Sequence, residues 1–561
     1  LVPFGFSGSV LIARDGEVVL EEGYGYADQQ REVPATAETV FSTGSVTKQF
    51  TAAAILKLEM DGKLSVEDPI TEYLEDVPPD KQAITLHQLL THSSGLAPFG
   101  NFFGDYEAWE SRDESIARFL GEPLLFEPGT GYEYSNAGYS ILAAIIEMVS
   151  GQSYEAYLRE KLFLPAGMMQ TGYRLPDWEH SQLAHFPEVP RGLNPEGFDT
   201  PLDVPFPFWL DLGNGEILST VGDLFKWKEA LKNHTVLDEE ATEKLFQPHV
   251  SENLPGIESY YGYGWVISTS PSGTRHIWHN GGTTGGMSAE FHWYPDDELV
   301  LIVLSNALLD GPTDGAARLV YDRLQALLFD EPLVMPPAAA APIPSSEELA
   351  RLAGTYETEN VASFTLLLQE GGGPIAEAQD AAALRLLVGN VSGDGEEGAS
   401  TLSGAEIRSV VEGLAQGEVD AYVDLLPPGA PTDEEEQFWS GWARESSERF
   451  GEFRRAEFLG TSQYGPWRQH FVAVEFARGY QFVACIPLEQ RSLFCMTDRA
   501  ILIPTTRPLV AQSANELVAF SPLFENVVHL RVADADGDLP TRVIITTDDG
   551  DVVAERVDVV E

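Results

Sequence analysis

The chain is 561 residues long and carries 88 Asp and Glu residues against 34 Lys and Arg residues, a formal net charge of −54 at pH 7. This length exceeds one ordinary hydrophobic core and predicts two or three domains. The strong negative charge argues against nucleic acid or an anionic membrane as a partner, and the sequence holds no apolar run that could span a bilayer.

Lysine is scarce in this acidic chain. Only nine of the basic residues are lysines, and the last of them is Lys244. A dense acidic surface repels itself in dilute salt and stays hydrated in concentrated salt. We therefore expect a halophilic or halotolerant source, with an acidic mesophile as the alternative.

Alternating strands open the chain, and a further strand and a helix come much later. Gly8 to Ala13 and Glu17 to Gly23 alternate around the turn signal Asp15-Gly16, which predicts a hairpin. Glu298 to Ser305 is expected to be a strand and Ala316 to Phe329 a helix. We expect strands from both ends of this region to form one antiparallel sheet, flanked by helices and a mostly helical subdomain, an α/β (α+β) fold. A small-molecule cleft is expected between sheet and subdomain.

A serine and a lysine three residues apart open a helical pattern. Val46 to Met60 predicts one helix, closed by Asp61-Gly62, with Ser45 at its start. Residues three apart share a helix face, so Lys48 is expected beside the Ser45 hydroxyl. Burial near the positive end of a helix lowers the pKa of a lysine toward the range of a general base. The tetrapeptide alone also fits a serine that merely caps a helix.

A tyrosine and an asparagine two residues apart follow a loop signal. Tyr134-Ser135-Asn136 comes after Pro128 to Gly131 and before an apolar helical pattern from Ala137 to Val149. In an extended loop, residues i and i+2 face the same side, so Tyr134 and Asn136 can point into one cleft. The alternative is a core tyrosine and an asparagine that caps the next helix.

A third polar run is rich in glycine. His279-Asn280-Gly281-Gly282 stands between the strand signals Thr274 to Trp278 and Gly286 to Tyr294. Glycine lets a ligand approach the backbone closely. The alternative is an ordinary loop histidine.

These three runs, in this order, are similar to those of the serine β-lactamase and penicillin-binding-protein family. The resemblance covers residues 6 to about 330 and is closest to the class C-like branch, which includes esterases, D-aminopeptidases and DD-peptidases. Other segments carry it as well: Phe41 to Gly44, Thr47 to Ala52, Phe6 to Val10, Leu89 to Leu96 and Phe126 to Gly129.

The resemblance implies a serine hydrolase that works through an acyl-enzyme. Ser45 would be the nucleophile, Lys48 its base, and Tyr134 the group that exchanges protons with nucleophile and leaving group. The amides of Ser45 and Gly282 would form the oxyanion hole. Which of Lys48 and Tyr134 is the main base stays open. The remaining substrate contacts implied are Asn136, Asn280 and Gly281.

His279 stands where many β-lactamases carry a lysine. A largely neutral imidazole is a weaker carboxylate anchor than an ammonium, and a better hydrogen-bond partner for Tyr134. We therefore expect carboxylic esters as substrates, D-amino-acid peptides or amides next, and β-lactams third. A catalytically silent protein that binds peptides or peptidoglycan fragments is the alternative from another class.

The chain after this region is expected to form a separate module. The hydrolase-like domain is assigned to residues 1–332, a Pro/Ala-rich linker to 333–346, and a C-terminal lipocalin-like β domain to 347–561. Residues 402–505 are expected to form an α+β insertion, cystatin-like or nuclear-transport-factor-like, in which Leu402 to Leu425 is helical and Pro427 to Glu436 an acidic loop. Strands of the barrel or sandwich are expected at 352–356, 364–369, 384–388, 528–532, 541–546 and 552–557.

The cysteines, the histidines and the N-terminus carry weaker signals. Cys485 and Cys495 flank a predicted hairpin turn, where a reduced, packed pair is favoured over a disulfide. No metal or cofactor is expected, since His87 and His92 are spaced wrongly for one helix face and 534–538 reads as a hairpin turn rather than a calcium loop. Oligomeric state stays open.

Two further expectations concern the pocket and the location. The loops Leu96 to Tyr106 and Leu193 to Leu212 are rich in aromatic residues and Pro, which predicts a mainly apolar acyl pocket. Family members usually have a helix before the first strand, and this chain starts without Met at Leu1-Val2-Pro3. An upstream element or a signal peptide is therefore expected, and family analogy favours a location outside the cytoplasm.

Overall fold

The computed structural model describes the chain in two compact units. The first, here the sheet–helix unit, spans Ser7–Ala307 and 314–331, and the second, the C-terminal unit, consists chiefly of Pro332–Glu561 together with Leu1–Phe6. The residues described are all except 30, 99–110, 186–208, 210, 254–257, 284–285, 308–314, 334, 339–343, 360–361, 369–372, 389–401, 428–431, 465–466, 488–491, 497–505, 522–525, 537–538, 548–549 and 558–561.

An antiparallel eight-stranded sheet forms the frame of the sheet–helix unit. Its strand order is β2-β1-β12-β11-β10-β9-β8-β7, so the first strands pair with the last, as the sequence predicts. Gly8 pairs with Ser305 and Arg14 with Leu299, and β12 is buried along its whole length. The strands are β1 (Gly8–Arg14), β2 (Glu17–Tyr24), β7 (Val250–Ser251), β8 (Tyr260–Tyr261), β9 (Val266–Thr269), β10 (Arg275–Gly282), β11 (Ser288–Tyr294) and β12 (Leu299–Ser305), with short pairs β3 (Tyr26–Asp28) and β4 (Val33–Pro34), and β5 (Phe41–Ser42) and β6 (Leu218–Ser219).

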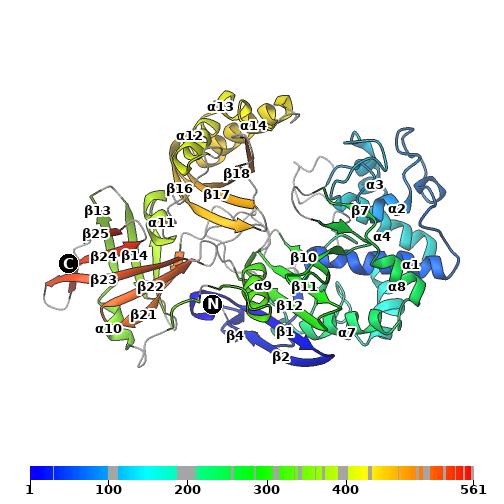
Figure 1. The fold of residues 1–561 in the computed structure, drawn as a ribbon, viewed down its shortest axis with the longest axis horizontal. Coiled ribbons are helices and arrows are strands. Elements are labelled where there is room, and N and C mark those ends of the chain that lie inside the picture. The colour runs from blue at the N-terminus through cyan, green and yellow to red at the C-terminus, as the bar shows by residue number, and fades with distance from the viewer. Residues whose placement is uncertain are drawn as a thin grey trace. The chain divides into compact units, whose positions relative to one another are not determined.

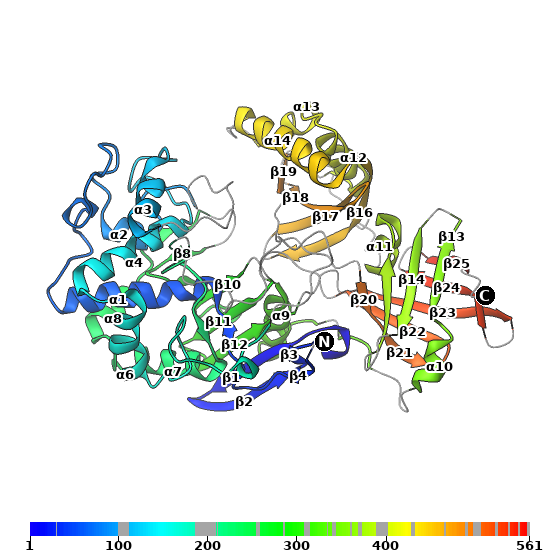
Figure 2. The same cartoon turned by 180° about the vertical axis from the view of Figure 1, so that it is seen from behind.

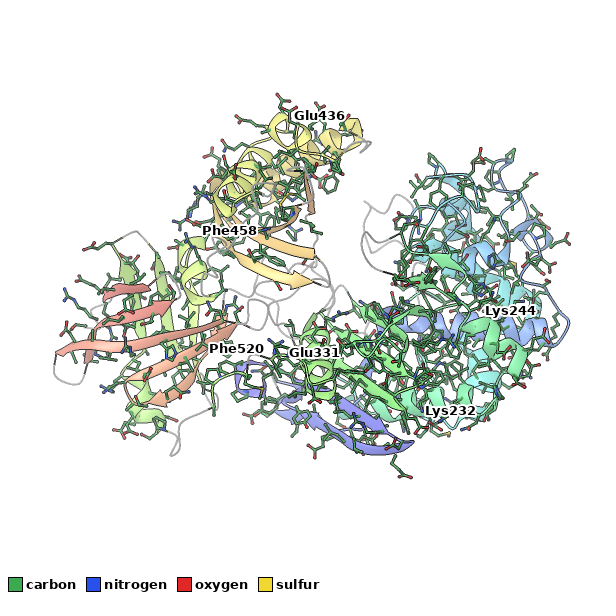
Figure 3. The ribbon with its side chains drawn as sticks, viewed as in Figure 1. Lys232, Lys244, Glu331, Glu436, Phe458 and Phe520 are labelled. Atoms are coloured by element: carbon green, nitrogen blue, oxygen red, sulfur yellow. A yellow bond between two sulfur atoms is a disulfide. The ribbon has the colours of Figure 1, made fainter. Side chains whose placement is uncertain are left out.

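Helices cover the sheet and build a subdomain beside it. Helix α9 lies against β11 and β12, while α1 to α4 gather away from β1 and β2 (Figures 1 and 2). Lys244, labelled in Figure 3, lies in the last turn of α8 and pairs with Glu59 of α1 at 2.7 Å. The helices are α1 (Lys48–Met60), α2 (Leu86–Leu90), α3 (Arg112–Gly121), α4 (Asn136–Ser150), α5 (Tyr154–Leu158), α6 (Leu164–Ala166), α7 (Val221–Lys232), α8 (Glu239–Leu245) and α9 (Gly315–Leu328).

The two helices that carry the polar runs begin in different ways. A 3₁₀ turn, Gly44–Thr47, precedes α1, so the regular helix begins two residues later than the predicted Val46. Helix α1 is buried on nearly all sides, which matches its Ala-rich sequence. Helix α4 begins with Ser135 as its N-cap, whose hydroxyl accepts a hydrogen bond from the Gly138 amide, and it ends at Gly151 in the left-handed conformation.

The C-terminal unit contains a nearly closed, barrel-like sheet. Its strand order is β20-β15-β14-β13-β25-β24-β23-β22-β21, and the two edge strands are consecutive in the chain, separated only by Leu509. The sheet ends are therefore adjacent. The strands are β13 (Gly354–Thr358), β14 (Ser363–Leu368), β15 (Pro374–Ala378), β20 (Thr506–Pro508), β21 (Val510–Ser513), β22 (Glu516–Ser521), β23 (Asn526–Asp536), β24 (Leu539–Thr547) and β25 (Gly550–Arg556).

Between β15 and β20 the chain forms helices over a four-stranded sheet. These elements and the barrel share a core, because Leu459, Phe471 and Phe482 belong to the same buried cluster as β13 and β14. The elements of this unit outside the barrel are α10 (Ser346–Ala350), α11 (Ala381–Val388), α12 (Gly404–Ala415), α13 (Asp420–Val423), α14 (Thr432–Phe450), β16 (Phe453–Tyr464), β17 (Trp467–Phe476), β18 (Gly479–Pro487) and β19 (Leu493–Met496).

Three expectations about this unit are wrong. The predicted strand 384–388 belongs to α11, which starts after Asp380, whose carboxylate accepts from the Ala383 amide and so caps a helix. The acidic loop ending at Glu436 is helical from Thr432 onward. Cys485 and Cys495 form a disulfide, because β18 and β19 place them directly opposite each other.

The first residues of the chain pack into the C-terminal unit. Phe4 is 3% exposed and lies in a cluster with Val510, Val518 and Phe520, and its ring centroid is 5.5 Å from that of Phe520, which Figure 3 labels. Among the described helices, none is long and apolar enough to cross a membrane.

Candidate active site

Ser45 and Lys48 meet at the start of α1. The Lys48 Nζ atom lies 3.1 Å from Ser45 Oγ, 2.6 Å from Asn136 Oδ1 and 2.7 Å from the Asn214 carbonyl oxygen. The two amide oxygens can only accept hydrogen bonds. A neutral amine has two N–H groups and one lone pair, so both N–H groups are used there and the lone pair remains for the Ser45 O–H.

The environment of Lys48 favours that neutral form. The side chain is fully buried, and burial holds the pKa of Lys48 well below its ordinary value, while the charge of Asp211 acts in the opposite direction. The Nζ atom also lies 4.7 Å from the ring centroid of Tyr134. The predicted direction of the shift therefore agrees with the structure.

A turn far away in the sequence holds this helix start. Asn214 lies in a turn that also binds the 3₁₀ segment: the Thr43 amide donates to the Ile217 carbonyl, and the Ile217 amide donates to Thr47 Oγ1. The sequence interpretation missed this turn. Its signal was the Gly213-Asn214-Gly215 run, whose backbone approaches α1 closely enough for Thr51 to donate to the Gly213 carbonyl.

The same turn carries two acidic side chains: Asp211, which interacts with Lys48, and Glu216, which binds Ser42. Burial raises the pKa of Asp211 to about 6, against the opposing charge of Lys48. Burial and Asp211 raise the pKa of Glu216 to about 8, while a hydrogen bond from Ser42 Oγ, 2.8 Å long, acts against this. The sequence interpretation missed both residues.

Tyr134 stands beside Lys48 on the loop before α4. Its hydroxyl is buried and makes no standard hydrogen bond to any residue that the structure describes, and its ring lies 4.3 Å from the ring of His92. Burial raises the pKa of Tyr134, an interaction with Ser45 lowers it, and the charge of Glu252 raises it further. At neutral pH the hydroxyl therefore keeps its proton.

Asn136 is the first residue of α4 rather than a loop residue. Its amide donates to the Pro98 carbonyl at 2.9 Å, and its side-chain oxygen accepts from Lys48. Ser135, not Asn136, caps the helix, so the alternative role considered for Asn136 does not apply.

His279 does not bind Tyr134 as expected. Its Nδ1 lies 2.6 Å from the Asn280 carbonyl oxygen, so Nδ1 carries the proton, and its Nε2 accepts from the Tyr261 hydroxyl at 2.9 Å. The His279 and Tyr134 ring centroids are 6.1 Å apart. Burial lowers the pKa of His279 to about 3, with a further decrease from Lys48. Tyr261 is a partner that the sequence interpretation missed.

The glycine run is part of strand β10, not a loop between strands. A Cβ atom on Gly281 would lie 2.0 Å from the Thr43 carbonyl oxygen and 2.8 Å from the Ser45 amide nitrogen, and one on Gly44 would lie 2.7 Å from the Gly282 amide nitrogen. These glycines therefore let the strand edge and the Ser45 turn touch. Strand alternation turns the Asn280 side chain to the face opposite His279, so its backbone carbonyl alone joins the His279 contact.

Other predicted features lie apart from these contacts or outside the described residues. Most of the two predicted pocket loops falls in 99–110 and 186–208, which the structure does not describe. His87 contacts Tyr263 and His92 accepts from the Ser135 amide. Within the described residues, no group of His, Cys, Asp or Glu side chains could hold a metal ion.

Comparison with known proteins places the sheet–helix unit among characterised relatives. The β-lactamase family model matches residues 6–326. A penicillin-binding protein of Bacillus subtilis is 31% identical over 59% of this chain and 74% of its own length, and a putative penicillin-binding protein of the same species is 32% identical over 54% and 72%.

One solved structure matches both units. The octameric penicillin-binding protein homologue from Pyrococcus abyssi aligns with 98% of this chain and 95% of its own, at 20% identity and a TM-score of 0.50. That similarity extends the shared fold beyond the region that the family model matches.

Proposed function

Because the chain belongs to the β-lactamase family of serine hydrolases, we propose that it hydrolyses carboxylic esters through an acyl-enzyme formed on Ser45. One observation carries this proposal. The buried Lys48 amine has both N–H groups bound by oxygens that only accept, which leaves its lone pair for the Ser45 hydroxyl 3.1 Å away. A general base needs that arrangement.

The first half-reaction uses these groups in order. Lys48 takes the hydroxyl proton, Ser45 Oγ bonds to the substrate carbonyl carbon, and the carbonyl π electrons move to oxygen. The Ser45 and Gly282 amides at the contact of β10 with the 3₁₀ turn would bind that oxyanion, a contribution of about 10²- to 10³-fold per donor. Collapse of the intermediate breaks the bond to the leaving group and gives the acyl-enzyme.

Tyr134 would supply the leaving-group proton. Its hydroxyl is protonated at neutral pH and interacts with Ser45, the residue that attacks, so it can act as a donor at this stage. Lys48, now charged, would return its proton through Tyr134 to the leaving oxygen. In the second half-reaction the same two groups would accept a proton from water, which attacks the acyl carbon and releases Ser45.

The neutral His279 supports esters over β-lactams. A protonated group at this place would attract a substrate carboxylate, but the imidazole is uncharged well below neutral pH and both ring nitrogens are engaged. D-amino-acid peptides or amides are the second candidate, because Tyr134 as proton donor also suits an amine leaving group.

Labelling and turnover test the proposal together. Intact mass after incubation with a fluorophosphonate should show one adduct, absent from Ser45→Ala, while the folded protein without an adduct would refute the mechanism. A panel of p-nitrophenyl esters, D- and L-aminoacyl anilides and a chromogenic cephalosporin, with Ser45→Ala as the blank, should rank the esters first. Faster turnover of the D-aminoacyl anilides would favour the second candidate.

A further inference from the structure

One face of the β7–β8 hairpin carries three polar side chains toward the site. Val250 pairs with Tyr261, and the Glu252 amide donates to the Ser259 carbonyl at 3.0 Å, which continues the pairing beyond β7. Residues two apart in a strand share a face. Glu252, Ser259 and Tyr261 therefore lie on the same side of the hairpin, the side on which Tyr261 binds His279.

Among the residues that the structure describes, two hydroxyl donors hold the Glu252 carboxylate. Tyr132 donates to its Oε1 at 2.9 Å, and Ser259 donates to its Oε2. Burial raises the pKa of Glu252, and the hydrogen bonds from Ser259 and Tyr132 act against that rise. In the described part of the chain Glu252 takes part in no ion pair, and its side chain is half-buried rather than enclosed. In its ionised form it is a negative charge without a matching cation among the residues that the structure describes.

A series of ring contacts runs from Tyr132, which binds Glu252, through His92 to Tyr134, the proposed proton donor. The His92 ring lies 6.1 Å from that of Tyr132 and 4.3 Å from that of Tyr134. Tyr132 and Tyr134 are both half-buried and are two residues apart on the same loop. The negative charge of ionised Glu252 raises the pKa of the Tyr134 phenol. The carboxylate thus lies on the side of the site from which the leaving group takes its proton.

The described groups around Ser45 supply no opposing positive charge. Burial lowers the pKa of Lys48 and so favours its neutral form, and His279 is neutral with both nitrogens bound. A carboxylate on the leaving group would meet Glu252 without a compensating cation. An ammonium there would meet a carboxylate that is bound by the Tyr132 hydroxyl, and both carboxylates and aromatic rings attract such cations.

We propose that Glu252, fixed by Tyr132 and Ser259, forms a subsite for a cationic leaving group, so that the preferred substrates are esters or amides whose leaving group carries an ammonium. The proposal rests on the acyl transfer proposed above and narrows its substrate class. Glu252 binds the departing part of the substrate and takes no proton from it.

Two esters that differ only in charge test this subsite. Acetylcholine and 3,3-dimethylbutyl acetate have nearly the same shape, and the wild type should show a kcat/KM at least about tenfold higher for acetylcholine. Glu252→Gln should bring the ratio close to one through the KM for acetylcholine, and any effect of the lost charge on Tyr134 acts on both esters and cancels in the ratio. Glu258→Gln, an exposed change on the same hairpin, is the matched control and should keep the wild-type ratio.

A binding measurement separates this proposal from the chemistry. Choline should bind to Ser45→Ala in calorimetry and should bind at least about fivefold more weakly to the Ser45→Ala, Glu252→Gln double variant. Equal binding to the two proteins, or an unchanged ester ratio in Glu252→Gln, would overturn the subsite while leaving acyl transfer standing. Choline binding without a fluorophosphonate adduct on the wild type would instead retain the subsite and refute the acyl-enzyme.

Discussion

Lys48 Nζ lies closer to Asn136 Oδ1, at 2.6 Å, than to Ser45 Oγ, at 3.1 Å. The asparagine is therefore more than a neighbour of the nucleophile. As an obligate acceptor from the amine it fixes which side of Lys48 faces the serine. It does so without adding charge, which keeps the lysine neutral.

Asn136→Asp tests this relationship with almost no change of shape. A carboxylate in contact with Lys48 favours the ammonium, so the pKa of Lys48 should rise by roughly 1–3 units. The acidic limb of the kcat/KM profile should move to higher pH, with activity at pH 7 reduced and partly recovered in alkaline buffer. Asn233→Asp, an exposed change at the end of α7, should leave the limb in place. If kcat/KM fell at every pH while the pH of the acidic limb stayed the same, Asn136 would not control the pKa of Lys48.

Tyr261→Phe should remove one hydrogen bond of the His279 ring while the aromatic ring at position 261 stays in place. The change deletes the O–H that donates to Nε2 and leaves that buried nitrogen unpaired, at a cost of about 1–3 kcal/mol in the free energy of unfolding. The lost donor had stabilised the neutral imidazole, so the pKa of His279 should rise. Chemical denaturation and histidine NMR titration measure the two effects. Unchanged stability would show that the hydrogen bond is not made in solution.

Gly281→Ala should separate the strand edge from the Ser45 turn. Its Cβ would meet the Thr43 carbonyl oxygen at 2.0 Å, so the backbone must move, and the oxyanion contact should be lost with about 10²- to 10³-fold lower kcat. Gly121→Ala serves as the control, because a Cβ there meets no atom within 4 Å. Near wild-type kcat in folded Gly281→Ala would place the oxyanion site elsewhere.

Glu216 makes stability depend on pH in the neutral range. Its pKa is raised to about 8 in the folded protein, above the ordinary value of about 4.5, so between these values the folded state binds the extra proton. The stabilisation that Glu216 gives the folded state is fully present below the ordinary pKa of about 4.5 and is lost as the pH rises through the folded pKa of about 8. Glu216→Gln, which still accepts from Ser42, should flatten this slope and stabilise the protein at pH 9 by on the order of 2 kcal/mol relative to wild type.

Urea unfolding measures that slope at pH 6, 7, 8 and 9. If the free energy of unfolding of wild type and of Glu216→Gln changed in parallel with pH, the Glu216 carboxyl would titrate at its ordinary pKa in the folded protein.

The acidic composition predicts salt-dependent stability. With a formal charge of −54, self-repulsion in dilute salt should weaken the fold, and molar KCl should raise the midpoint of urea unfolding. Insensitivity to molar salt would favour the acidic mesophile. Because screening of simple charge is complete well below 1 M, a continued rise above that concentration would be the sign of a salt-adapted surface.

Local sequence patterns predicted the parts of the site that depend on short spacings. The Ser45 to Lys48 interval follows from helical periodicity, and the pairing of β1 with β12 follows from two apolar strands. The extended-loop argument for Tyr134 and Asn136 does not hold, because Asn136 begins α4. The turn with Asn214 could not be found in this way. Its carbonyl reaches Lys48 from 166 residues away, and carbonyl positions leave no trace in side-chain patterns.

The errors have physical causes of the same kind. His279 was expected to bind Tyr134 because the family resemblance placed both residues in one site. Strand β8 instead brings the Tyr261 hydroxyl to the His279 ring. In segment 384–388, β-like and helical patterns could not be distinguished over so few residues. The disulfide depended on the register of two strands, which spacing alone does not set.

The placement of Phe4 has a consequence for synthesis of the chain. Phe4 is synthesised before the sheet–helix unit, whereas its partners Val510, Val518 and Phe520 leave the ribosome only after that unit. At about 5–20 residues per second, that delay is on the order of half a minute to two minutes. During this interval the sheet–helix unit can fold before the site for Phe4 exists, so the C-terminal unit is completed by segments that are synthesised at different times.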